Sequence, residues 1–250
     1  MIEASSLRGE VAEAADVLAR LGLVTAYGHV SARAGDAMLI TPAADLAGVT
    51  ASQVIAVPLT AAPPLPAGVP AEAWVHLALY RTRPDAAAIA RAQPVSGFAA
   101  AAIATSLAPL HGQAAWLGES IPVHDSATLI RSPELAERAA SSLPRGEALL
   151  LRGNGAITLG AAPGLAVARM WVLAAACEVY LAALGAPITP LSAGEIASWR
   201  AVGGELLPRH TPGRGARLPR CRPGSRPRRG CTWRCTARAR TRPRSPGPSR

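Results

Sequence analysis

Apolar positions recur with two different periods between residues 8 and 184, and this mixture predicts a chain of helices and strands. Helical spacing is found at 8–21, 72–80, 94–105, 133–143 and 163–184. Strand-like runs are found at 54–59, 86–90, 121–125, 148–151 and 156–159, and residues 27–42 predict two strands around a turn at 33–36. Strands with helices on both sides imply an α/β domain of three layers, α/β/α.

Turn and cap residues separate these predicted elements. Gly22 ends the first helix, and Ser132 is placed to cap the helix that begins at Pro133. Residues 61–70 contain four prolines and a glycine, which predicts a loop. The Asn154-Gly155 step predicts a turn between the last two strands.

Composition changes abruptly near residue 209. Residues 210–250 are mostly arginine, proline, glycine, serine and cysteine, with almost no aliphatic side chains to form a core. We therefore expect one folded domain at 1–209 and a disordered tail at 210–250. Two interpretations of the tail stay open: a basic segment that binds nucleic acid, and the out-of-frame translation of a GC-rich gene, which we favour because the tail lacks repeats and interleaved aromatic residues.

The charge of the chain is unevenly distributed. The net charge is +10, but residues 211–250 hold 13 of the 26 arginines and no acid, so residues 1–210 carry 13 arginines against 16 acids, a net of −3. This distribution argues against nucleic acid as a partner of the folded domain, except through non-specific contacts of the tail. No uncharged apolar run reaches the length of a membrane helix, and Glu3 stands where a signal peptide is basic, so we expect a cytoplasmic protein.

The chain has no lysine, since all 26 basic residues are arginines. A Schiff-base mechanism through a lysine amine is therefore excluded. If the protein cleaves carbon–carbon bonds, it must stabilise the resulting carbanion electrostatically.

Several segments, in order, resemble the class II aldolase/adducin family over roughly residues 8–205. They are GLV at 22–24, GHVSAR at 28–33, LITP at 39–42, EAWVHLALY at 72–80, RPDAAAIARAQP at 83–94 and ALLLRGNGAIT at 148–158. The resemblance implies a three-layer α/β/α fold with a central mixed, largely antiparallel sheet. It also implies a homo-oligomer, a tetramer in this family, that acts on a small-molecule substrate.

The family's zinc ligands are replaced in this chain. In the family an Arg-Pro-Asp turn leads into a strand that ends in His-x-His, and a third histidine follows much later. Here the three positions hold Arg91, Gln93 and Asn154. A guanidinium has no lone pair to offer a metal and amides bind zinc weakly, so we assign no metal or other cofactor to this chain.

The resemblance implies that Glu72 is the general acid/base, because a family glutamate occupies this place on the helix before the ligand strand. A carboxylate beside a pocket can shuttle a proton of an enolate or hydroxyl. The alternative is that Glu72 only complements the dipole of the helix N-terminus in solvent. His76, one turn further along, is expected to form a structural hydrogen bond inside the helix layer.

This chain also lacks most of the residues that form the phosphate pocket in the sugar-phosphate members of the family. The family's three pairs of pocket residues correspond here to 28–29 (Gly-His), 43–44 (Ala-Ala) and 70–71 (Pro-Ala). Most hydroxyl donors are gone, which makes a phosphorylated sugar an unsuitable substrate. The candidate substrate-binding residues are Gly28, His29, Ser31, Thr41, Gln93 and Asn154. Of these, His29, Ser31 and Thr41 could bind a carboxylate, and the alternative for His29 is that it only ties the hairpin together.

Two functions are compatible with these residues. The first is a carbon–carbon lyase, of aldehyde-lyase or decarboxylase type, acting on a small non-phosphorylated hydroxy or keto acid or carbonyl compound. Glu72 would then be the acid/base, and Arg91 would supply the positive charge that zinc supplies in the family. The second is a catalytically inactive, metal-free oligomeric binding module on the same fold, as in the adducin head.

Overall fold

The computed structural model describes residues 2–24 and 27–206. At the centre of this part of the chain is an eight-stranded sheet. The strands lie in the order β3-β2-β1-β4-β8-β7-β6-β5, and every neighbouring pair is antiparallel except the parallel pair β6 and β7. They are β1 (His29–Ala34), β2 (Ala37–Ile40), β3 (Ile55–Pro58), β4 (Ala88–Ala92), β5 (Ser106–Leu107), β6 (Ile121–His124), β7 (Ala148–Leu151) and β8 (Gly155–Gly160). The sheet is thus mixed and largely antiparallel, as expected.

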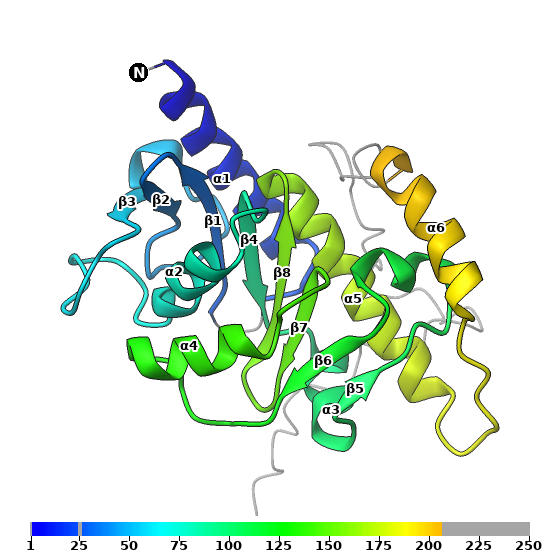
Figure 1. Ribbon diagram of the computed structural model, residues 1–250. Coiled ribbons are helices and arrows are strands. Elements are labelled where there is room, and N and C mark those ends of the chain that lie inside the picture. The colour runs from blue at the N-terminus through cyan, green and yellow to red at the C-terminus, as the bar shows by residue number, and fades with distance from the viewer. Residues whose placement is uncertain (1, 25–26, 207–250) are drawn as a thin grey trace, which may run out of the picture. The chain divides into compact units, whose positions relative to one another are not determined.

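Helices cover both faces of this sheet (Figure 1). The helices are α1 (Ile2–Arg20), α2 (Ala73–Thr82), α3 (Val95–Ile103), α4 (Pro133–Ser141), α5 (Pro163–Ala182) and α6 (Ala193–Leu206), with 3-10 turns η1 (Ala51–Gln53) and η2 (Gly112–Leu117). Helices α1, α3 and α5 pack on one face, and α2 and α4 pack together on the other. The three-layer α/β/α fold is confirmed.

Alternation along β4 separates two hydrophobic cores. Ala88, Ala90 and Ala92 belong to the core beneath α1, α3 and α5. Ile89 belongs to the core beneath α2 and α4. Because successive side chains of a strand point to opposite faces, Arg91 lies on the α2 face beside Ile89.

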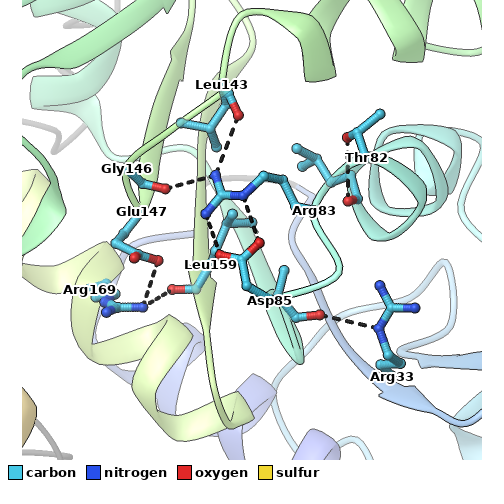
Figure 2. Close-up of polar contacts among 11 residues, drawn as sticks. Arg33, Thr82, Arg83, Asp85, Leu143, Gly146, Glu147, Leu159 and Arg169 are labelled. Carbon is cyan, nitrogen blue, oxygen red and sulfur yellow. Dashed lines mark hydrogen bonds and ion pairs between the residues drawn. The ribbon is translucent and has the colours of Figure 1, made fainter.

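The Arg-Pro-Asp turn fastens the start of β4 to the loop before β7 (Figure 2). The Arg83 guanidinium donates to both carboxylate oxygens of Asp85, at 2.9 and 2.7 Å. It also donates to the carbonyl oxygens of Gly146 at 3.0 Å and Leu143 at 3.4 Å. A planar guanidinium can satisfy four acceptors at once, so this turn fixes where β4 enters the sheet.

The predicted elements agree with the structure apart from their ends. The Ser132 cap is confirmed, since its hydroxyl accepts a hydrogen bond from the Leu135 N–H at 3.4 Å. The strand predicted at 86–90 lies two residues later, at Ala88–Ala92, because residues 83–86 form the turn just described. Helix α6 and the two-residue strand β5 were not predicted from the sequence.

Helix α5 is long and apolar enough to cross a membrane by length and composition alone. Half of that window is buried inside the domain, where α5 packs against β4 and β8, as the core helix of a folded protein does. The cytoplasmic location stays a prediction. The predicted disordered tail at 210–250 lies outside the described residues.

Candidate functional site

The strands β1 and β4 place polar side chains side by side under α2. His29 in β1 is the register partner of Arg91 in β4. His29, Ser31, His76 and Arg91 are all buried, and His76 projects from α2. His29 and Ser31 are two residues apart in β1, so their side chains lie on the same face of the sheet.

Arg91 is the buried cation of this cluster, with 3% of its surface exposed. Its Nη2 donates to the backbone oxygen and to Oδ1 of Asn154, both at 3.2 Å. Its Nε and Nη1 atoms are buried and have no hydrogen-bond partner among the described residues. Burial lowers the pKa of the guanidinium, and the Glu72 carboxylate opposes that change. Arginine remains charged under such shifts, so the cluster holds a fixed positive charge.

Asn154 contacts Arg91 at the end of β4, and Gln93 follows Arg91 by two residues. Asn154 begins the return into β8, and its side-chain amide donates to the Thr128 carbonyl at 3.1 Å. A Cβ at Gly155 would lie 2.2 Å from the Ala92 oxygen and 3.0 Å from Gln93 Cγ, and this glycine has φ of 94°. Only glycine permits such a close approach with positive φ, so the turn is held against β4 and the three family ligand positions converge.

These three residues do not fit a zinc ion. The Arg91 guanidinium is bound to Asn154, and the neighbouring Gln93 oxygen is a neutral amide. Zinc in proteins is held by thiolate, imidazole and carboxylate groups. Within the described residues, no three such side chains are grouped closely enough to hold a metal.

Ser31 connects two residues of α2. Its Oγ lies 2.8 Å from His76 Nδ1 and 2.8 Å from Tyr80 Oη. His76 forms a hydrogen bond, but its partner is Ser31 of the strand β1 and not a residue of the helix layer. His76 Nε2 is buried without a partner among the described residues. Burial, then the Arg91 charge, lowers the pKa of His76 to about 3, and the same causes hold the pKa of His29 well below its usual value.

Thr41 and Gly28 shape the backbone around β1. The Thr41 hydroxyl accepts from the Val30 N–H at 3.2 Å and is fully buried. A Cβ at Gly28 would lie 2.8 Å from a Val24 methyl group and 3.3 Å from the Arg91 carbonyl, so a larger residue would separate β1 from β4. The predicted contacts of Thr41 and Gly28 with a substrate stay predictions.

Glu72 is placed at the beginning of α2, where it forms no capping hydrogen bond through its side chain. Its side chain is 14% exposed, and its Oε1 accepts from Arg131 Nε at 3.3 Å. Glu72 is therefore largely enclosed and tied to the segment before α4, in contrast to a carboxylate that only complements a helix end in solvent. It also lies near enough to raise the pKa of Arg91.

Two residues of the cluster were not proposed from the sequence. Tyr80 shares a helical face with Glu72 and His76 at i, i+4, i+8, so this spacing was the available signal. No sequence pattern indicated a role for Arg131, because it contacts Glu72 from a loop that is 59 residues away in sequence.

Known proteins resemble this chain in sequence and in fold. Residues 9–181 match the model of the Class II Aldolase and Adducin N-terminal domain. The 3,4-dihydroxyphthalate decarboxylase of Terrabacter sp. (strain DBF63) is 28% identical over 206 residues, which cover 75% of this chain and 86% of that protein.

Solved structures show the same likeness. L-fuculose-1-phosphate aldolase from Thermus thermophilus superposes with a TM-score of 0.64 at 27% identity, over 73% of this chain and 95% of that one. YgbL from Escherichia coli gives a TM-score of 0.69 at 23% identity, over 79% of this chain and 99% of that one, and so shares the fold. Since the family model matches more than half of the chain, the protein belongs to the class II aldolase and adducin N-terminal domain family.

Proposed function

We propose that the protein is a carbon–carbon lyase of decarboxylase type that acts on a small, non-phosphorylated hydroxy or keto acid. The observation that carries this proposal is the buried Arg91 charge, whose Nε and Nη1 have no partner among the described residues. An unpaired buried charge is costly, and an anion that binds beside it removes that cost. Enzymes of this family are lyases, including aldolases and a decarboxylase.

Arg91 can stabilise the negative charge that develops on the substrate in this reaction. When a carboxylate leaves as carbon dioxide, the electron pair of the broken bond stays on the remaining carbon and is delocalised onto a neighbouring carbonyl oxygen. A fixed guanidinium against that oxygen stabilises the transition state without reorganisation. Retro-aldol cleavage leaves the same kind of enolate, so both reactions use the same positive group.

Glu72 is the proposed acid/base. The carbanion must take up a proton at carbon, and a carboxyl group at the edge of the site can return one. Glu72 is enclosed at the start of α2 and electrostatically coupled to Arg91. Arg131, 58% exposed, binds Glu72 Oε1 and would hold the carboxyl group in place during turnover.

The surroundings of the site favour a carboxylic acid over a sugar phosphate. The pairs at 43–44 and 70–71 offer no hydroxyl groups, and the Ser31 hydroxyl is engaged with His76 and Tyr80 inside the protein. The similarity to a decarboxylase of a dihydroxylated aromatic acid supports the same substrate class. We expect Gln93, whose buried Oε1 has no partner among the described residues, to contact the substrate.

The test is turnover by the purified full chain. It would be incubated with 3,4-dihydroxyphthalate and with a panel of small hydroxy and keto acids, while carbon dioxide and aldehyde products are measured. We expect turnover of at least one acid, reduced about 100-fold or more by Arg91→Gln and by Glu72→Gln. Arg138→Gln, a change at an exposed arginine of α4, is the matched control and should keep full activity.

No turnover of any acid would contradict the proposal and favour the non-catalytic oligomeric module. Turnover that survives Arg91→Gln unchanged would contradict the role of Arg91. The expected homo-oligomer would be checked on the same samples by sedimentation.

A further inference from the structure

The side chains of Tyr80, Ser31 and His76 form a buried hydrogen-bond chain. Its two links are each 2.8 Å, and all three side chains are almost fully enclosed. Only one nitrogen of His76, Nδ1, takes part in the chain. The other, Nε2, is buried without a partner among the described residues, in the cluster that holds Arg91.

The number of protons in the chain selects one arrangement. If the Tyr80 O–H donates to Ser31 Oγ and the Ser31 O–H donates to His76 Nδ1, both hydroxyl protons have acceptors. The imidazole proton then sits on Nε2, and this N–H is the one group of the chain without a partner among the described residues. In the reverse direction His76 donates to Ser31 and Ser31 donates to Tyr80, which leaves two groups without a partner, the Tyr80 proton and the Nε2 lone pair. The first direction leaves fewer buried polar groups unpaired and is therefore favoured.

We propose that Tyr80 and Ser31 fix His76 in the tautomer that carries its proton on Nε2, and that this N–H, beside Arg91, binds the anionic oxygen of the substrate. The second half of this proposal rests on the lyase function proposed above. Tyr80 and Ser31 are then positioning residues, while His76 and Arg91 contact the substrate. His29 packs against His76, with ring centroids 5.7 Å apart and ring planes tilted by 53°.

The pKa values of His76 and Tyr80 favour an uncharged N–H donor at His76. The low pKa of His76 keeps its ring neutral near pH 7, so only its tautomer remains to be chosen. Burial raises the pKa of Tyr80, which keeps the phenol as a hydrogen-bond donor. A neutral N–H next to a guanidinium offers an anion two kinds of donor without placing two positive charges together.

Nitrogen NMR of the histidine side chains tests the tautomer directly in the full chain near pH 7. His76→Asn identifies the His76 signals by their loss. We expect one protonated nitrogen, Nε2, in the wild type, and a population protonated on Nδ1 in Ser31→Ala and in Tyr80→Phe. Thr158→Val is the control, because it removes a buried hydroxyl that bonds to Ala166 on the opposite face of the sheet.

Two NMR results would overturn the tautomer assignment. One is a proton on Nδ1 of His76 in the wild type. The other is an unchanged His76 spectrum in both Ser31→Ala and Tyr80→Phe. Neither result depends on turnover, so the assignment can fail while the lyase function stands, and the reverse.

Benzoate, added with a chelator present, tests the contact with an anion. We expect it to shift the Nε2 resonance of His76 and to bind about tenfold more weakly to His76→Asn, since a donor to a charged oxygen is lost. His76→Gln, whose longer amide reaches toward the Nε2 position, should restore affinity to within about threefold. Benzoate that binds without moving the Nε2 resonance would overturn the contact.

Discussion

Arg91 stands at one of the three positions where the family resemblance places a metal ligand, and under the proposed function this exchange sets the chemistry of the site. A metal ion polarises an oxygen as a Lewis acid, whereas a guanidinium stabilises it through hydrogen bonds and charge. Arg91 is bound by Asn154 on one side only, so two of its nitrogens remain for a ligand. Under the proposed function, the exchange therefore puts a fixed positive charge, which needs no cofactor, at the same position in the fold.

The buried histidines predict a loss of stability in acid. His76 has a pKa of about 3 in the folded protein and an ordinary value of 6.5, and the pKa of His29 is also well below 6.5. Between pH 6.5 and 3, His76 is protonated in the unfolded chain but stays neutral in the folded chain. The free energy of unfolding is therefore highest above pH 6.5 and decreases as the pH falls through this range. We expect a loss of about 1.4 kcal/mol per pH unit for each such histidine.

Urea unfolding at about pH 7 and about pH 5, on either side of the ordinary histidine pKa, measures this effect. His76→Asn should show a smaller loss between the two values than the wild type. A free energy of unfolding that is equal at both pH values would contradict the burial of neutral histidines in this cluster.

Restoring the family ligands should create a metal site. The triple variant Arg91→His, Gln93→His, Asn154→His keeps the strand and turn that bring the three positions together, and zinc should raise its melting temperature. The wild type should contain well under one equivalent of zinc and should not respond to added zinc. About one zinc per wild-type chain by elemental analysis would show that other residues, such as His29 and His76, bind the metal.

At the scale of elements, two turns position the site. The Arg83 turn fixes the start of β4 (Figure 2). Gly155 holds the β7–β8 turn against the end of the same strand. Arg91 lies between them, so its place depends on both.

Gly155→Ala is expected to disturb the site, because a Cβ there would meet the Ala92 carbonyl at 2.2 Å. Gly35→Ala is a matched control, since Gly35 also has positive φ, 60°, but no atom lies within 4 Å of its Cβ position. Gly35→Ala should cost about 1 kcal/mol from backbone strain alone. Gly155→Ala should cost a further 1–3 kcal/mol, roughly, from the clash. Equal urea midpoints for the two variants would contradict the close approach.

The sequence patterns predicted most helices and strands, but not the helix α6 or the strand β5. The period of 3.6 located the five predicted helices, because each has one face in a core, and short apolar runs located the central strands, which are buried on both faces. Helix α6 was missed, since its helical face contacts little of the core, yet Ser192 and Glu195 form a capping pair that the sequence already contained. The two-residue strand β5 is too short to show a period.

At the scale of the whole molecule, the resemblance located the cluster but not its internal bonds. The order of motifs identified the fold and placed Arg91, Gln93 and Asn154 at one point. It did not show that Ser31 is engaged with His76 and Tyr80, or that Arg131 holds Glu72, because such partners come from segments that meet only after folding. The proximity of Arg91 to Asn154 was thus predictable, whereas the hydrogen bonds of the cluster required the tertiary structure.

Under the proposed function, a guanidinium provides the positive charge of this site in place of a metal ion. Calorimetric titration of benzoate into the full chain, with and without a chelator, tests this role. We expect wild-type protein to bind benzoate equally in both conditions, and Arg91→Gln to bind it at least about tenfold more weakly, because a charged partner is lost. Binding that disappears on chelation and returns with added zinc would contradict it.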